Sequence, residues 1–256
     1  MNIFLQPFII SNSKKFITMK TLLGFLSFIL ATCCVNNISA QEQITHSQGY
    51  ATVDTKRTAM TSMEKDMVKE INLVRTDPKG YVKHVKTYMS TVMFPQEKAT
   101  AEELIAELEQ MQPLPALKEA DCLFMAARDH ATNQAPTGDL NHVDTNQKGP
   151  SDRVWAVCSS IFAEHYKENG WNVSAGNENL EGSAGDGDYK PNSARNANIN
   201  LLIDHGIQGR GHRKNILSPM FTHAAAFTYK DKVGTSYWNR WIQKYGMDKN
   251  SPNAVK

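Results

Sequence analysis

Three polar side chains, His142, Glu178 and His212, lie in stretches rich in glycine or asparagine at the edges of expected elements. Two imidazoles and a carboxylate suit Zn²⁺ or a similar divalent ion. The same groups could instead form an acid–base set around a water molecule. Asp204 or His205, at the end of an expected helix, would supply a fourth group. Spacing alone does not bring such distant residues together, so both kinds of site, and unrelated loop residues, stay open at this point.

The segment before His212 is suited to hold one side chain at a fixed angle. An apolar helical run ends at Asp204, and Gly206, Gly209 and Gly211 follow within a few residues. Glycine adopts backbone angles that are closed to other residues, and imidazole binds metals and titrates near neutral pH. The alternative is a glycine helix cap at Gly206 followed by a solvated loop histidine.

Helix signals fill the first half of the chain. Thr61 and Glu64 have the spacing of a capping box, and Asp77-Pro78 ends the first helix and begins a second. Thr100 starts a second capping-box spacing, which predicts a short third helix. A longer helix is expected at about 118–134, a short one at 150–155, and another after the capping residue Ser193. We expect His130, on the longer helix, at the edge of the core rather than as a ligand.

Strands are expected mainly toward the C-terminus, at 173–180, 224–230 and 236–245, the last two joined by a turn at 231–234. The tryptophans at positions 155, 171, 238 and 241 are expected in the core and the sheet. This order of elements predicts an α+β fold in which helices pack on a small antiparallel sheet. No internal repeat and no boundary between domains is evident.

The composition limits the function classes. A chain of 256 residues, 41% of them hydrophobic, can bury a substantial core in one large domain or two small ones. The formal net charge is +2, and no run of Lys and Arg is interleaved with aromatic residues. Nucleic-acid binding is therefore excluded as an interpretation.

The N-terminal region has the pattern of an export signal. Residues 22–35 are apolar but too short for a spanning helix, and Lys20 precedes them. We predict a signal peptide at 1–40, translated from Met1 or Met19 and cleaved before Gln41, and a mature chain without a membrane span. Lipidation at Cys33 is the alternative, and an uncleaved segment would be an anchor. A flexible leader at 41–60, a domain at 61–247 and a tail at 248–256 should follow.

Two cysteines, Cys122 and Cys158, remain after that cleavage. An exported location permits a disulfide between them, although two buried free thiols are also compatible with the sequence. We predict the disulfide, which would contribute roughly 3–4 kcal/mol in the chain-entropy model.

The motifs that carry these residues resemble a known family. Ala175-Gly-Asn-Glu-Asn-Leu180 followed by Gly211-His-Arg-Lys-Asn-Ile-Leu217 looks like the paired signature of the CAP superfamily, which covers cysteine-rich secretory, antigen 5 and pathogenesis-related proteins. An opening helix like Glu70–Arg75, the Pro113–Leu117 segment and the loop at His142 follow in the same order. Ser151-Asp-Arg153 and the Arg-Thr-Asp-Pro sequence are similar to its exported bacterial branch. The resemblance covers about 61–247.

The resemblance implies an α–β–α sandwich with a central cleft. In that family the cleft contains two histidines and two acidic residues that can take up a divalent metal. By motif, His142 and His212 match the histidines and Glu178 one acid, although Asn177 is an extra residue before it. Asp204 fits the fourth position by chemistry, but His205 could occupy the aligned place. A third imidazole there would favour metal binding, with Zn²⁺ as the expected ion.

Three functions are compatible with this resemblance. The first is a binding or signalling module that recognises a lipid, peptide or cell-wall component outside the cytoplasm. The second is a metal-dependent hydrolase of extracytoplasmic peptide or glycan, in which Glu178 or Asp204 would be the catalytic acid or base. The third is a structural envelope protein. The sequence contains no recognised nucleophile motif, which favours the binding module.

Overall fold

The structure, a computed structural model, describes residues 49–91, 93–160, 173–185, 193–233 and 236–248. The predicted signal peptide, and the predicted tail beyond Asp248, lie outside these ranges. Within them, no helix is both long enough and apolar enough to cross a bilayer.

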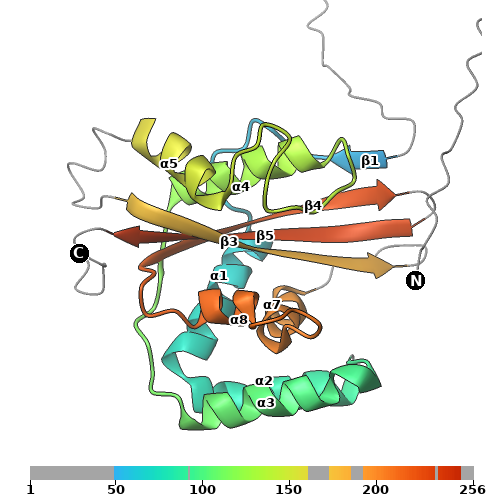
Figure 1. Cartoon of the computed structure of the whole chain (residues 1–256), viewed down its shortest axis with the longest axis vertical. Helices are drawn as coiled ribbons and strands as arrows, with labels where there is room; N and C mark the ends of the chain where they lie inside the picture. The colour runs from blue at the N-terminus through green and yellow to red at the C-terminus, as the bar shows by residue number, and fades with distance from the viewer. Residues whose placement is uncertain (1–48, 92, 161–172, 186–192, 234–235, 249–256) are drawn as a thin grey trace, which may run out of the picture. The chain divides into compact units, whose positions relative to one another are not determined.

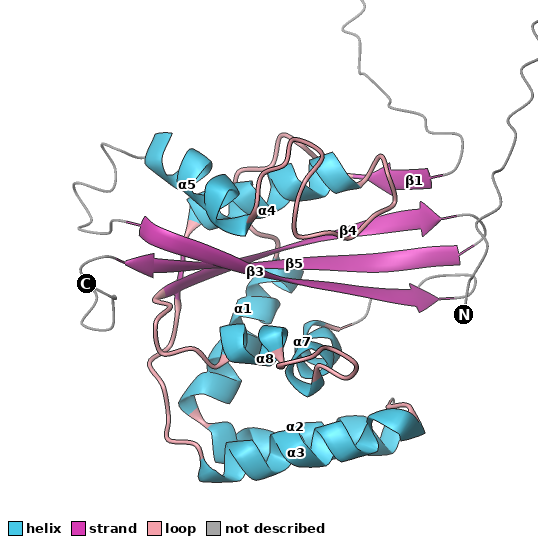
Figure 2. Cartoon of the chain, viewed as in Figure 1, coloured by secondary structure: helices cyan, strands magenta, loops and turns pink. Residues whose placement is uncertain are grey.

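An antiparallel sheet lies at the centre of the fold (Figure 2). Its strands follow the spatial order β1 (Gly49–Thr52), β4 (His223–Val233), β5 (Ser236–Asp248) and β3 (Val173–Gly185). The short β2 (Lys118–Glu119) pairs with β4 in the parallel sense. β3 is therefore an edge strand on this path.

Helices cover both faces of the sheet (Figure 1). On one face are α4 (Asp121–Gln134) and α5 (Pro150–Ser160). On the other are α1 (Ser62–Thr76), α7 (Ala194–Ile203) and α8 (Gly211–Ile216), with α2 (Pro78–Thr91), the 3-10 turn η1 (Pro95–Glu97) and α3 (Lys98–Gln110) beyond them. The predicted α–β–α sandwich is thus the observed fold.

The sheet separates two apolar cores because successive strand side chains point to opposite faces. Trp241 and Tyr245 of β5 belong to the core that includes α1, α2, α3 and α7. Ile242, between them, belongs to the core under α4 and α5. All three side chains are fully buried. Trp155, in contrast, is 56% exposed on α5, so its expected place in the core is wrong.

Two of the predicted helix caps are present. The Thr61 hydroxyl accepts the Glu64 backbone N–H at 3.3 Å, and the Glu64 carboxylate accepts the Thr61 N–H at 2.7 Å. Ser193 caps α7 by accepting the Asn196 N–H at 3.2 Å. The predicted cap at Thr100 is wrong: α3 begins two residues earlier, after η1, so Thr100 lies inside the helix.

Strand pairing corrects two further expectations. Residues 118–119 were expected to be helical but form β2, because backbone pairing with β4 keeps them extended until α4 begins at Asp121. Residues 49–52 were expected in a flexible leader but form β1, because β4 continues to Val233 and presents an edge that they pair with. Met60 is 8% exposed, so the ordered fold begins before residue 61.

The predicted disulfide is present. Cys122 of α4 and Cys158 of α5 are bonded, with their Cα atoms 5.0 Å apart. Both residues are buried. The bond therefore joins the two helices that cover the face of the sheet on which Glu178 lies.

Candidate functional site

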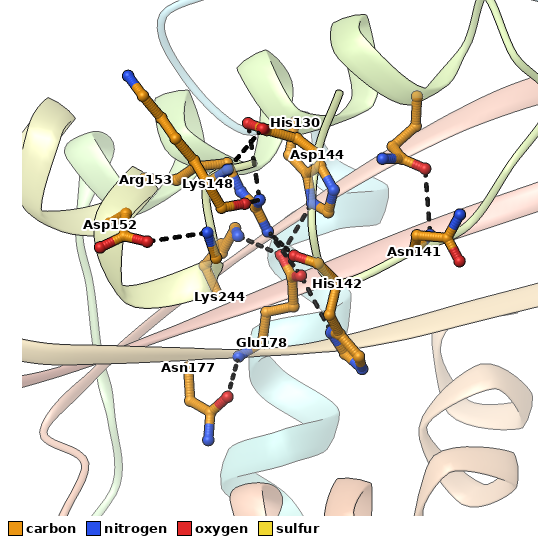
Figure 3. A network of polar contacts seen from close by, with 12 residues as sticks. His130, Asn141, His142, Asp144, Lys148, Asp152, Arg153, Asn177, Glu178 and Lys244 are labelled. Atoms are coloured by element: carbon orange, nitrogen blue, oxygen red, sulfur yellow. Dashed lines mark hydrogen bonds and ion pairs between the residues drawn. The ribbon is translucent and has the colours of Figure 1, made fainter. Parts of the chain in front are cut away.

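Glu178 is the centre of a buried polar cluster (Figure 3). It lies on β3 opposite Lys244 of β5 and is 1% exposed. Its Oε1 accepts from Arg153 Nη2 at 2.7 Å and from His142 Nδ1 at 3.1 Å. Its Oε2 accepts from His130 Nδ1 at 2.9 Å and from Lys244 Nζ. An ionised carboxylate only accepts hydrogen bonds, so both histidines donate through Nδ1.

Glu178 faces two cations in this cluster, Lys244 and Arg153. Burial opposes ionisation of Glu178, but hydrogen bonds from His130 and His142 and the Lys244 charge hold the pKa of the carboxyl well below its usual range. Burial lowers the pKa of Lys244 to about 8, against the pull of Glu178, and burial also lowers the pKa of His130. Near neutral pH the cluster therefore contains an ionised Glu178, a cationic Lys244 and a neutral His130.

Arg153, near the start of α5, anchors the loop that carries His142. Its Nη2 donates to the His142 carbonyl at 2.8 Å as well as to Glu178, and its Nη1 lies 3.7 Å from the Asp144 carboxylate. Asp144 Oδ1 in turn accepts the Lys148 backbone N–H at 2.9 Å. One guanidinium thus fixes both the backbone of His142 and the carboxylate that its ring contacts.

His212 is positioned by Asp204. Asp204 ends α7 with a left-handed φ of 54°, and its carboxylate accepts His212 Nδ1 at 2.7 Å and the His212 backbone N–H at 2.9 Å. Gly206 and Gly209 have φ of 76° and 80°, as expected of a glycine-built turn. His212 itself, however, lies in the first turn of α8 and not in the loop. Arg210 makes the last left-handed turn before that helix, with φ of 53°.

Asp204 and His205 make different contacts. His205 Nδ1 lies 3.1 Å from the Thr100 hydroxyl on α3, and His205 is exposed. Asp204 is 3% exposed and contacts His212. The acidic residue, and not the third imidazole, is therefore the neighbour of His212.

Side-chain amides join β3 to α8. Asn177 Nδ2 donates to Asn215 Oδ1 at 2.9 Å, and Asn215 Nδ2 donates to Asn179 Oδ1 at 2.8 Å. Asn179 Nδ2 donates to the His212 carbonyl at 3.1 Å. The two sequence motifs are thus joined through their asparagines, and the extra Asn177 is part of that joint.

The rings of His142 and His212 lie close to each other. The ring centroids of His142 and His212 are 6.1 Å apart and the ring planes are inclined by 41°. Their side chains are 48% and 17% exposed. Each ring uses Nδ1 for a carboxylate, which leaves Nε2 as the nitrogen without a hydrogen bond among the described residues. The structure thus brings His142, Glu178, His212 and Asp204 together.

The donor set fits a metal only in part. Among the described residues, no group of three or more His, Cys, Asp or Glu side chains is arranged to hold an ion. Glu178 and Asp204 lie behind the histidines, as carboxylates commonly do behind metal-bound imidazoles. His142 and His212 could therefore supply two imidazole ligands, and water or a bound molecule would have to complete the coordination.

His130 and Lys244 belong to the cluster but were not expected there. His130 was expected at the core edge, yet it is 0% exposed and hydrogen-bonded to Glu178. Lys244 stands between buried residues of β5. A lysine inside an otherwise buried strand needs a charged partner, and this was the signal in the sequence that could have identified it.

The sequence profile of the cysteine-rich secretory protein family, abbreviated CAP, matches residues 68–245. No curated protein and no solved structure gives a significant match. The matched range contains all the histidines and acids of the cluster.

Proposed function

Because the chain belongs to the cysteine-rich secretory protein (CAP) family, we propose that it is an exported binding protein of the bacterial branch, with His142 and His212 as its ligand-contacting residues. The observation that carries this proposal is the pair of carboxylate–imidazole contacts. Glu178 accepts from His142 and Asp204 accepts from His212, each through Nδ1. Such contacts fix the tautomer so that the Nε2 lone pair is available to a metal or to a donor on a ligand.

A divalent metal, with Zn²⁺ as the first candidate, is part of this proposal. Neutral imidazoles are common zinc ligands, with Zn–N distances near 2.0–2.1 Å. A ring separation of 6.1 Å leaves both histidines within reach of one ion. A bound metal would supply a Lewis acid between the two histidines.

A hydrolase reaction is supported less well than binding. It would need Glu178 or Asp204 to accept a proton from a water molecule. Glu178 is 1% exposed and already balances Lys244 and Arg153, while Asp204 accepts two hydrogen bonds from His212. Neither carboxylate has the exposure of a general base. A structural envelope role would leave the side chain of His142, which is 48% exposed, without a function.

Export is supported by the Cys122–Cys158 disulfide, because disulfides persist in oxidising compartments. We expect N-terminal sequencing of the mature protein to begin at Gln41. A mature protein that begins at a lipidated Cys33 would replace secretion with membrane anchoring.

Zinc calorimetry on the purified protein tests the binding proposal. His142→Ala and His212→Ala should each remove most of the binding while circular dichroism stays unchanged. His205→Ala is the matched control, because His205 is the neighbouring histidine that contacts Thr100 instead. Equal loss in all three variants would contradict the assignment of the ligands. Absence of zinc, copper, nickel and manganese binding by the unmodified protein would remove the metal from the proposal.

A further inference from the structure

β3 is the edge strand of the sheet next to the histidine pair. In Figure 1, α5 lies on one side of this strand and α8 on the other. Its pairing with β5 runs from Ala175 to Gly185 without a change of register. In an antiparallel pair, alternate residues direct both of their backbone groups to the same neighbour. Every second residue of β3 therefore directs its N–H and C=O away from β5.

Side chains satisfy the first of these outward groups. The Gly176 carbonyl accepts from Ser151 Oγ at 2.6 Å, and the Gly176 N–H donates to the same oxygen at 3.4 Å. The Glu178 carbonyl accepts from Asn215 Nδ2 at 3.3 Å, and the Glu178 N–H donates to Asn177 Oδ1 at 2.9 Å. This part of the edge is thus closed to another strand.

The next outward residues of β3 are Leu180 and Gly182. Within the part of the chain that the structure describes, neither forms a hydrogen bond outside the sheet. The Leu180 side chain packs in the core under α4 and α5, and Gly182 has no side chain and is partly exposed. Both residues therefore present backbone groups at the edge rather than side chains.

We propose that the β3 edge at residues 180–182 binds an extended peptide as an added strand. The N–H and C=O groups of two residues, one position apart from each other, match the backbone of another strand. The closed part of the edge ends at Glu178, which accepts from His142, so one end of the peptide would lie beside the histidine pair. The contact uses backbone groups and needs no metal, so it goes beyond the proposed histidine site.

A free peptide fits this edge better than a second copy of the chain. Helices α5 and α8 contact β3 from both faces of the sheet. The β3 edge of a second copy would bring its own α5 and α8 against them, whereas a single extended peptide has no flanking helices.

The test is amide hydrogen exchange by NMR on the isotope-labelled, disulfide-intact protein, with the probe acetyl-Thr-Val-Thr-Val-Thr-amide, whose residues favour strands. In the free protein, Leu180 and Gly182 should exchange faster than Glu181, which pairs with Trp241 in the ladder. The probe should slow exchange at Leu180 and Gly182 about tenfold and leave Glu181 unchanged. The same peptide N-methylated at every residue should have no effect, because the methyl groups remove its donors and block the approach of the strands.

Gly182→Pro and Gly182→Ala form a matched pair of variants. Both add a Cβ, which would lie 2.6 Å from Arg240 Nη1. Only proline also removes the N–H that faces away from β5. Proline should therefore weaken probe binding about tenfold relative to alanine. Zinc calorimetry on both variants should match that of the unmodified protein, so failure of one proposal does not decide the other.

Three results would overturn the inference. The first is exchange at Leu180 and Gly182 as slow as at Glu181 in the free protein, which would mean that the edge is closed. The second is no effect of millimolar probe on the unmodified protein, and the third is equal probe affinity of the proline and alanine variants. A dimer in sedimentation that Gly182→Pro dissociates would likewise replace the peptide with a second copy of the chain.

Discussion

Replacement of Glu178 by Gln should destabilise the fold, because this residue is the anion of a buried cluster. The side chain keeps its size but loses its charge. Lys244 is 0% exposed and Arg153 is 6% exposed, so neither cation can recover the lost interaction from water. Breaking one partner out of a buried ion pair typically costs about 3–5 kcal/mol. For a domain of this size that corresponds to a fall in Tm of roughly 6–20 °C.

The measurement is urea unfolding followed by circular dichroism, with the disulfide kept oxidised. Glu103→Gln is the matched control: Glu103 also pairs with arginines, but its side chain is 50% exposed. The Glu103→Gln substitution should therefore lower the free energy of unfolding by less than about 1 kcal/mol.

A double-mutant cycle isolates the buried pair. In Glu178→Gln/Lys244→Met the unpaired ammonium is gone, so the combined loss should be smaller than the sum of the single losses by roughly 0.5–3 kcal/mol. A Glu178→Gln loss no larger than that of Glu103→Gln, or strict additivity in the cycle, would refute the view that a charged Glu178 balances Lys244.

Three further predictions concern stability. Cys122→Ala should lower the free energy of unfolding by roughly 3–4 kcal/mol in urea, because it opens the covalent loop to Cys158; a change under about 1 kcal/mol would disagree. Burial, with the nearby Lys118 charge, lowers the pKa of His223 to about 4. As the pH drops from about 6.5 to 4, His223 therefore takes up a proton in the unfolded chain but not in the folded one, and the free energy of unfolding should fall by on the order of 2 kcal/mol. His223→Gln should flatten that part of the pH–stability curve. Gly176→Ala should destabilise by about 1–3 kcal/mol, because a Cβ there would lie 2.6 Å from Val154, whereas Gly211→Ala meets nothing within 4 Å and should be nearly neutral in the same melts.

Local signals in the sequence predicted helix starts of the fold correctly where they act between neighbouring residues. The capping box at Thr61 and the cap at Ser193 act through neighbouring residues, so sequence spacing alone was sufficient to predict them. Thr100 has the same spacing as Thr61 but lies inside a helix, because Pro95 begins a 3-10 turn ahead of it. β1 could not be predicted, since only the exposed edge of β4 makes residues 49–52 a strand.

The site was predictable only as far as its motifs extend. His142, Glu178 and His212 were identified because each stands in a motif of fixed order. Asp204 and His205 are adjacent, and only the left-handed turn at Asp204 decides which of them contacts His212. Lys244 reaches Glu178 through strand register, which depends on the pairing of β3 with β5 across the fold.

The disulfide closes a covalent ring with a sequence separation of 36, and the residues that surround Glu178 from one side are all members of that ring. His130, His142 and Arg153 lie between Cys122 and Cys158 in the chain. The most exposed part of the ring, residues 145–148, is a natural place for proteolytic nicking. A single cut there would leave both halves bonded to each other, with His130 on one and Arg153 on the other still held at Glu178. A molecule nicked by a protease should therefore separate into two fragments on a denaturing gel only after the disulfide is reduced. Until then it should keep His142 and His212 in place.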